Sequence, residues 1–275
     1  MLERLIFKNH VNEEISVGST SGIFANYSDL HDYAWSHNVK GDRISGFKKG
    51  VVKKTIPIII QCNTEEDGIK ARNQLYEIAE KDIIANIPGM LIVGDYYMKC
   101  FISCSKKSEY LESKRHMKAS LTIVTDSPMW VKETTISFRN NTGSTAEGNN
   151  LDYENDFPYD YSSNLVGRTL FNSNFLPCNF RMTIFGDCTN PEVMIAGHLY
   201  KVNASLEAAE YMVIDSVEKT IYKVTEDGTR VNLFNDRERS SYIFEKIPVG
   251  NNGVSVSTFD FDITLLEERS EPLWI

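Results

Sequence analysis

Two carboxylates near the C-terminal end of the chain have a spacing that could serve acid catalysis. Asp260 and Asp262 alternate with Phe259, Phe261 and Ile263, so in a β-strand the two acids share one face. Same-face neighbours on a strand lie about 7 Å apart, within the range known for inverting glycosidases. Any half-exposed strand shows the same alternation. We therefore favour a solvated strand face over a catalytic pair.

A second acidic group has the spacing that opens a calcium-binding EF-hand loop. It consists of Asp152, Glu154 and Asp156, but Phe157 occupies the position of the required glycine and Ser163 that of the required glutamate. The loop needs the glycine for its sharp turn and the glutamate as a bidentate ligand. We interpret the group as an acidic loop and predict no metal site there.

Three tyrosines, Tyr153, Tyr159 and Tyr161, lie in the same polar tract, residues 140–164. Exposed tyrosine is favoured at protein contacts, so these side chains could form a recognition surface. Equally, they could fasten the tract onto the domain that carries it. The sequence leaves both interpretations open.

The cysteines do not have the pattern of a disulfide framework or a zinc site. Their number is odd, and no two of them form a C-x-x-C pair. Cys100 and Cys104 lie in a run typical of a strand, which would separate them by about 13 Å, too far to share a metal. We interpret all five as buried thiols: Cys62, Cys100, Cys104, Cys178 and Cys188.

The common catalytic motifs are absent from the sequence. It contains no G-x-S-x-G, H-E-x-x-H or G-x-x-x-x-G-K-[ST] motif, and no G-x-G-x-x-G motif after a strand. No histidine has a second ligand at metal-binding spacing; the five are His10, His31, His37, His116 and His198. We therefore predict no catalytic residues, no cofactor and no metal, and we predict that the protein is not an enzyme.

The formal net charge of −9 is unevenly distributed. Residues 1–130 contain 17 Lys and Arg against 16 Asp and Glu, whereas residues 131–275 contain 12 against 22. An acidic half repels phosphate, which disfavours sequence-specific binding of nucleic acid. One short basic cluster, Lys48, Lys49, Lys53 and Lys54, is interpreted as a solvated hairpin tip.

Targeting and membrane signals are also lacking. Residues 1–8 do not contain the apolar core of a signal peptide. The densest apolar run, residues 56–60, is far shorter than a membrane span and contains Pro57. We expect the protein to be made and folded in a cytoplasm, without a membrane partner.

The first half of the chain has an α+β pattern. A helix is predicted over residues 65–81, because Thr64 can cap it, acids fill its first turn, and one stripe is apolar: Ile69, Ala71, Leu75, Ile78 and Ala79. Strands are predicted at residues 5–8, 14–17, 33–40, 51–61, 89–93, 96–105, 108–111 and 117–124, with residues 41–50 as a connection. This order indicates a small sheet with one helix laid on it.

The second half reads as all-β. Short strands are predicted at residues 132–139, 194–202, 211–215, 219–225, 230–234, 241–247, 254–257 and 259–266, with turns at 226–229 and 248–253. Such spacing is typical of a sandwich or barrel. The whole chain is thus predicted to be mainly β, with domains at residues 1–130 and 131–275 and a long polar loop at 140–164.

The second half resembles the distal tail protein family of siphophages. The resemblance rests on GDCTNP at 186–191, VMIAG at 193–197, MVID at 212–215, FEKIP at 244–248 and ERSEPLW at 268–274. The first half agrees in its layout and ends on Pro128-Met129-Trp130, as the second ends on Pro-x-Trp. These motifs are patterns of turns and packing and cover almost the whole chain.

The resemblance implies a structural protein at the virion tail tip. In this family the N-terminal domain forms a hexameric ring that continues the tail tube and leaves a channel for DNA. The C-terminal domain is a galectin-like antiparallel β-sandwich. The implied partners are further copies of the chain, the tail tube protein, a tail-associated adhesin or lysin, and receptor-binding proteins.

Two other functions compete with this one. A carbohydrate-binding module for attachment to the host cell wall is the alternative, drawing on the sandwich and the tyrosines of the tract. The galectin sugar motif H-x-N-P-R is missing, because Thr189 precedes Asn190-Pro191 and Glu192 follows them. A wall-degrading hydrolase would rest on Asp260 and Asp262 alone.

Overall fold

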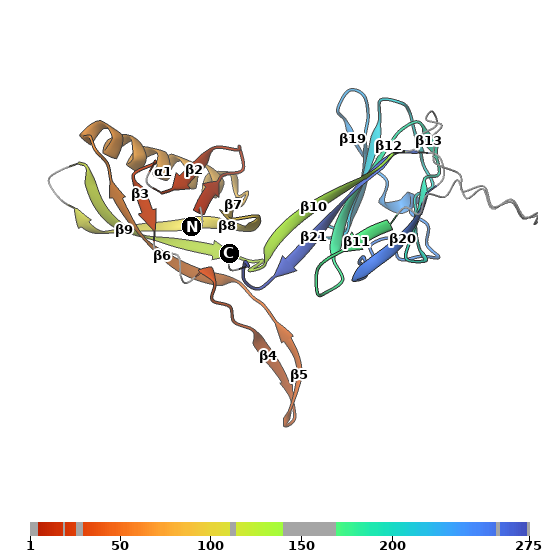
Figure 1. Cartoon of the computed structure of the whole chain (residues 1–275), viewed down its shortest axis with the longest axis horizontal. Helices are drawn as coiled ribbons and strands as arrows, with labels where there is room; N and C mark the ends of the chain where they lie inside the picture. The colour runs from red at the N-terminus through yellow and green to blue at the C-terminus, as the bar shows by residue number, and fades with distance from the viewer. Residues whose placement is uncertain are drawn as a thin grey trace, which may run out of the picture. The chain divides into compact units, whose positions relative to one another are not determined.

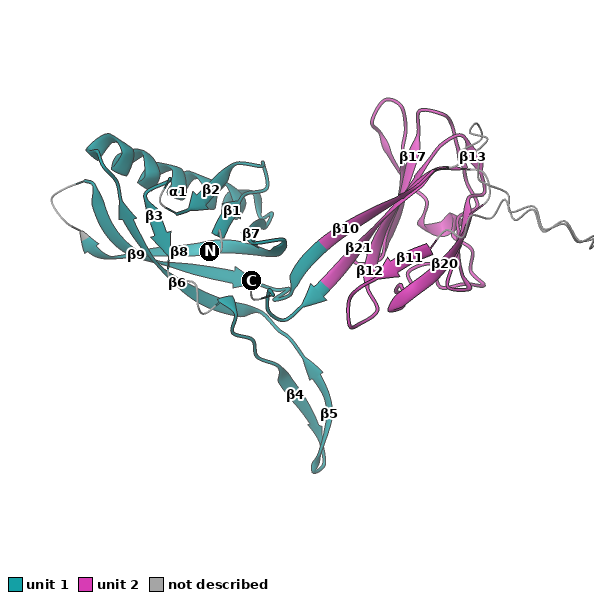
Figure 2. Ribbon diagram, in the orientation of Figure 1, with its two compact units in different colours: residues 1–132, 268–275 teal, residues 133–267 magenta. Residues whose placement is uncertain are grey.

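The computed structural model describes residues 5–18, 20–25, 30–110, 114–139, 169–256 and 259–273. The chain forms two compact units (Figure 2). Unit 1 contains Met1–Lys132 together with Glu268–Ile275, and unit 2 contains Glu133–Glu267. The chain enters unit 2 along one strand and leaves it along another, so the last residues belong with the first unit.

The described residues of unit 1 form antiparallel strands and the helix α1 (Figure 1). One set of strands has the order β2–β1–β7–β8, and a second set has the order β3–β6–β9–β8, so β8 belongs to both. The bounds are β1 (Leu5–Lys8), β2 (Glu14–Val17), β3 (Ile23–Ala25), β4 (Ser36–Lys40), β5 (Arg43–Lys48), β6 (Val52–Gln61), α1 (Glu65–Ala85), β7 (Gly89–Val93), β8 (Tyr96–Tyr110), β9 (His116–Thr125) and β10 (Trp130–Phe138). Their inner faces form one core, which includes the fully buried Trp130.

Helix α1 begins at the residue that the sequence indicated. The Thr64 hydroxyl accepts a hydrogen bond from the backbone N–H of Asp67, and three acids occupy the first turn. The helix continues four residues beyond Lys81, to Ala85, where Asn86 ends it in a left-handed conformation. The predicted apolar stripe was wrong at Ile69, which is exposed. Gly68 is buried instead, because a residue without a side chain lets the carbonyl of Lys114 approach the helix at this position.

Two strand predictions in unit 1 need correction. Residues 108–111 were expected as a separate strand, but β8 runs without interruption to Tyr110. Its pairing with β9 shifts register twice, between Ile102 and Cys104 and between Lys107 and Glu109. Residues 41–50 were expected as a connection, but β5 lies within them and pairs with β4. Gly41 makes this possible with a φ of +64° at the turn.

Unit 2 is an antiparallel β-sandwich, which confirms the predicted class. One sheet has the order β19–β18–β17–β12–β21–β10, and the other has the order β11–β20–β14–β15. The bounds are β11 (Thr169–Asn172), β12 (Asn179–Phe185), β13 (Cys188–Thr189), β14 (Glu192–Ile195), β15 (His198–Lys201), β16 (Ser205–Leu206), β17 (Tyr211–Asp215), β18 (Thr220–Val224), β19 (Arg230–Asn232), η2 (Phe234–Asp236), β20 (Gly250–Val256) and β21 (Phe261–Arg269).

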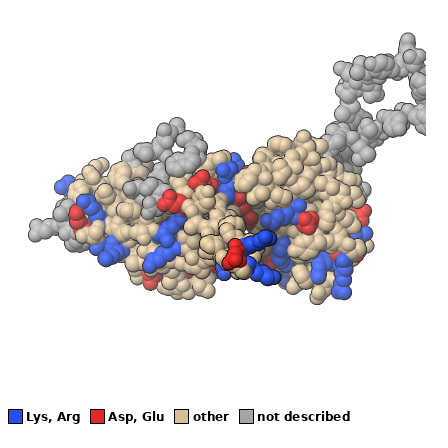
Figure 3. Space-filling view, turned by 90° about the horizontal axis from the view of Figure 1, so that it is seen from below, with Lys and Arg blue, Asp and Glu red and all other residues tan. Residues whose placement is uncertain are grey.

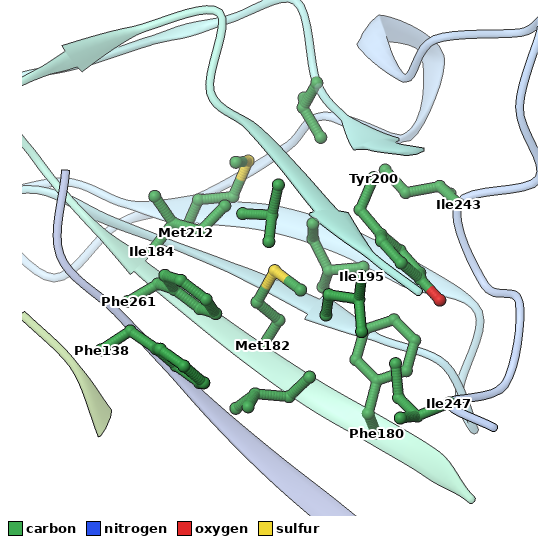
Figure 4. Packing of buried hydrophobic residues seen from close by; sticks show 14 of the residues in the cluster. Phe138, Phe180, Met182, Ile184, Ile195, Tyr200, Met212, Ile243, Ile247 and Phe261 are labelled. Atoms are coloured by element: carbon green, nitrogen blue, oxygen red, sulfur yellow. The ribbon is translucent and has the colours of Figure 1, made fainter. Parts of the chain in front are cut away.

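Aromatic and aliphatic side chains fill the core of unit 2 (Figure 4). Phe138 and Phe261 stack with ring centroids 4.7 Å apart, and Phe180 meets Tyr200 edge to face. The Tyr200 hydroxyl donates a hydrogen bond to the carbonyl of Glu245, which satisfies its polar end. Asp262 lies on the opposite, outward face of β21, as its alternation with buried residues predicted.

Three predictions in unit 2 were wrong in detail. Residues 194–202 form two strands, because Ala196 and Gly197 adopt positive φ and reverse the chain between β14 and β15. Residues 241–247 form no strand: Ile243, Phe244 and Ile247 are buried, a spacing without the period of two that a strand requires. Strand β20 starts at Gly250, inside the predicted turn.

Replacing Thr64 by Ala should destabilise unit 1 by about 1 kcal/mol, because the Asp67 N–H loses its cap. Tryptophan fluorescence during urea unfolding would measure this, since Trp35 and Trp130 belong to unit 1 and residues 133–267 contain no tryptophan. Asn73→Ala on the exposed side of the same helix is the matched control and should not destabilise. An unchanged midpoint for Thr64→Ala would contradict the capping role.

Candidate functional site

The two predicted catalytic carboxylates form an ion-pair cluster with an arginine. Atom Nη1 of Arg139 lies 2.7 Å from Oδ1 of Asp262, and Nε of Arg139 lies 3.9 Å from Oδ2 of Asp260. Burial alone would raise the pKa of Asp262, but hydrogen bonds from Arg139 and Ser137 outweigh it and hold that pKa below its ordinary value. A glycosidase acid needs a raised pKa, so this arrangement favours a structural role.

The other sequence candidates that lie within the described residues do not assemble into a site. All five cysteines are free, but the prediction of five buried thiols was wrong for Cys104, which is exposed; Cys100 and Cys178 are buried, and Cys62 and Cys188 are half-buried. Burial raises the pKa of the Cys100 thiol to about 12, which makes it unreactive. Among the residues that the structure describes, no three His, Cys, Asp or Glu side chains come close enough to hold a metal. The acidic group Asp152, Glu154 and Asp156 and the tyrosines Tyr153, Tyr159 and Tyr161 lie outside the described residues.

Two of the four clustered lysines, Lys49 and Lys54, are not solvated as the sequence suggested, whereas Lys48 and Lys53 are exposed. Lys49 donates hydrogen bonds to the carbonyl of Pro128 and the hydroxyl of Ser270, and its ammonium lies 4.8 Å from the centre of the Trp35 ring. Lys54 donates to the carbonyl of Asp32. Burial, and then the charge of Lys54, lower the pKa of Lys49. These lysines therefore anchor the base of the β4–β5 hairpin.

The β4–β5 hairpin, here called the arm (residues 36–48), is the most exposed pair of strands in unit 1 (Figure 1). It extends away from the other strands of the unit, and β4 and β5 form their own two-stranded sheet. A two-stranded hairpin is marginally stable in water by itself. The arm therefore depends on its anchored base and gains from any partner that covers it.

One face of the arm is apolar. Phe47 pairs with His37 and Ile44 pairs with Val39, so all four side chains share a face. Val39, Ile44 and Phe47 are 59–63% exposed. Clusters of exposed large apolar side chains mark binding surfaces.

Basic side chains lie on the opposite face of the arm. Lys40 pairs with Arg43 and Lys48 with Ser36, each one residue out of step with the apolar pairs, and Asp42 in the turn is the one acid of the arm. Figure 3 views the molecule from below, the direction in which the arm points, and shows both blue and red groups near its centre. The arm is therefore amphipathic, with an apolar face on one side and a basic face on the other.

Sequence reasoning missed the arm because of a bulge. Asn38 pairs with Gly46 and Val39 with Ile44, which leaves Ser45 as the extra residue. The bulge places Ile44 and Phe47 three residues apart, so the period of two that identifies a strand is broken. The dipeptide Gly41-Asp42, which lies between residues of β propensity, was the one remaining sequence signal for a hairpin turn here.

Comparisons with known proteins identify solved structures only. No protein-family model and no curated protein matches the chain. The Dit protein (gp 19.1) of phage SPP1, described as a paradigm of the hub adsorption apparatus in phages that infect Gram-positive bacteria, is 8% identical with a TM-score of 0.59. The match covers 98% of this chain and 100% of the SPP1 chain.

A chain of the phage P2 baseplate in its activated conformation is also similar, in structures with Ca and with Sr. In both, the identity is 12% and the TM-score 0.61, with 99% of this chain and 100% of the baseplate chain covered. This protein therefore has the fold of phage tail hub proteins over 98–99% of its length. The resemblance seen in the sequence is confirmed at the level of the fold.

The Arg139–Asp262 ion pair should make stability depend on pH. Because the folded pKa of Asp262 is lowered, its charge stabilises the fold above the unfolded pKa of about 3.9, and this stability is lost as pH falls through the folded pKa. Asp262→Asn should cost about 1 kcal/mol at pH 7, and the difference should shrink below about pH 4.

Circular dichroism during urea unfolding at several pH values would measure this difference. Asp42→Asn in the exposed turn of the arm serves as control and should change little at any pH. A constant difference between Asp262→Asn and the parent from pH 7 down to pH 2 would contradict the ion-pair role.

Proposed function

We propose that the protein is a structural component of the distal end of a phage tail, where it forms a ring that joins the tail tube to the baseplate. The full-length match to the SPP1 hub protein and to a baseplate chain carries this proposal. The exposed arm supports it, because its apolar face is left uncovered in a single chain. The family resemblance, and not the structure, implies that the ring contains six copies.

Unit 1 is the ring-forming unit in this proposal, and unit 2 carries the contacts to other tail-tip proteins. The arm belongs to unit 1, and the acidic half of the sequence makes up most of unit 2. An acidic surface repels DNA, which suits a unit that stands outside the channel. The proposed partners are the tail tube protein, a tail-associated adhesin or lysin, and receptor-binding proteins.

The site chemistry supports a structural role for the protein. Both candidate acids form ion pairs with Arg139, and the buried thiol of Cys100 has a raised pKa. Among the described residues, no helix has the length and apolar content needed to cross a membrane. We propose assembly in the host cytoplasm and a final location at the virion tail tip. No described feature favours the carbohydrate-binding alternative.

Particles that carry a tagged copy of the protein test the proposal directly. Gold labelling and electron microscopy should place the tag in a ring at the distal end of the tail. Label along the shaft or on the head, or particles without the protein, would overturn the proposal. A monomer in dilute solution does not bear on this test, because ring interfaces form at high local concentration.

The double substitution Val39→Ser with Phe47→Ser should abolish ring formation while leaving the fold intact. Both side chains are exposed, so each change should alter stability by less than about 0.5 kcal/mol. Sedimentation at high concentration measures assembly, and circular dichroism checks the fold. Val231→Ser, at an exposed apolar position of unit 2, is the control and should assemble normally. Normal rings from the double variant would show that the arm is dispensable.

A further inference from the structure

One edge of unit 2 carries no charge. Residues 169–180, which contain β11 and the loop after it, include no Asp, Glu, Lys or Arg, and neither do residues 247–256, although these four types make up 24% of the chain. The two segments lie side by side, because β11 pairs with β20 and the backbones of Cys178 and Ile247 exchange two hydrogen bonds. Depletion of charged residues is typical of the centre of a protein interface.

Four large apolar side chains are exposed along this edge. Phe171 is 57% exposed, Phe175 64%, Leu176 51% and Val249 48%. Phe171 lies on the outward face of β11, since its two neighbours in the strand are buried. The four side chains are here called the edge patch. Exposed apolar side chains that gather in this way mark binding surfaces.

Buried asparagines hold the edge patch in one shape. The amide nitrogen of the fully buried Asn172 lies 3.4 Å from the carbonyl oxygen of Leu176 and 3.1 Å from that of Pro248, which directly precedes the last member of the patch. The side-chain oxygen of Asn174 accepts a hydrogen bond from the backbone N–H of Phe175. A surface that is already ordered loses little conformational entropy when a partner binds.

Strand β11 is the edge of its sheet. Among the residues that the structure describes, it pairs with β20 alone, at the end of the order β11–β20–β14–β15 (Figure 2). Edge strands that stay unpaired are usually protected by lysine, by proline or by a bulge. The sequence of β11 is TLFN, without lysine or proline, and its register with β20 is regular. The strand is therefore suited to accept another strand.

We propose that β11 accepts an extended, uncharged segment of another tail-tip protein as an additional strand of its sheet. The inference rests on the proposed function, in which unit 2 carries the contacts to such proteins. Apolar side chains of the segment pack on the edge patch, while its backbone pairs with the free side of β11.

The edge itself specifies this partner. The segment is extended, because a strand is the element that satisfies a row of backbone N–H and C=O groups. It is uncharged, since a charge buried against the edge patch would find no opposite charge there. A second copy of unit 2 is disfavoured, because residues 131–275 contain 12 Lys and Arg against 22 Asp and Glu, and two such acidic units repel each other.

Site-specific cross-linking in assembled particles tests the contact. Phe175 is replaced by the photoreactive p-benzoylphenylalanine, and mass spectrometry maps the product formed on irradiation. We expect a cross-link to another tail protein, within a run of at least about five residues that contains no charge, the length of a typical strand. Met194, replaced in the same way, is the matched control, because it is 45% exposed on the outward face of the same sheet but in an inner strand. It should give at least about tenfold less product.

A charge on the edge strand provides the second measurement. Phe171→Lys should lower the yield of the cross-link from position 175 about tenfold, because a lysine on an edge strand opposes the addition of another strand. Met194→Lys is the control and should leave the yield within about twofold of the parent. Circular dichroism confirms that both variants are folded.

Hydrogen exchange distinguishes strand addition from the packing of side chains alone. The amides of β11 that face away from β20 should exchange at least about tenfold more slowly in assembled particles than in the isolated protein, because the added strand accepts their hydrogen bonds. Equal exchange rates in the two states would overturn strand addition.

The outcomes separate this contact from the proposed function. A cross-link from position 175 only to this chain or to a second copy of it, a cross-linked segment rich in charge, or no product above the Met194 control would each overturn the inference and leave the ring at the tail tip intact. Gold label away from the distal end of the tail would instead overturn the proposed function.

Discussion

Strand β8 holds unit 1 together, because its two halves pair with different strands. Its first half pairs with β7 and its second half with β9, so the strand belongs to both sets of strands. The inner faces then enclose one core, to which Met98, Cys100 and Ile102 of β8 contribute. The helix and several strands are positioned by this arrangement. Helix α1 packs against β8, and the turn after α1 delivers β7 to the free edge of β1.

The arm is independent of this core, and that independence suits an interaction element. Its side chains contribute nothing to the buried cluster, so they can be chosen for a partner without cost to the fold. Its direction is nevertheless determined at the base, where Lys49 connects the end of β5 to Pro128 and Ser270. Ser270 belongs to the C-terminal segment of unit 1. The chain end that returns from unit 2 therefore helps to hold the arm in place.

Sequence reasoning succeeded where a local rule decides the structure. Strands β1, β2, β7 and β17 have the predicted bounds, because alternation and turn residues mark them clearly. It failed where the rule is broken: the bulge at Ser45 hid β5, and the positive φ of Ala196 hid a turn. The functional residues were harder to predict. Asp260 and Asp262 have catalytic spacing, but in the structure both form ion pairs with Arg139. The sequence did not show this, because Arg139 lies 122 residues before Phe261 in the sequence and beside it in the fold.

The sequence alone therefore determined the class of the protein: mainly β, with one helix capped by Thr64, and a last strand with Phe261 and Ile263 inward and Asp262 outward. Periodicity and capping are local, so they can be read without coordinates. Only the tertiary structure decided which apolar residues stay uncovered. Ile69 and Ile78 are equally apolar in sequence, yet Ile78 is buried and Ile69 faces outward. The reason is that burial depends on which strands pack against the helix, and residues distant in sequence supply those strands.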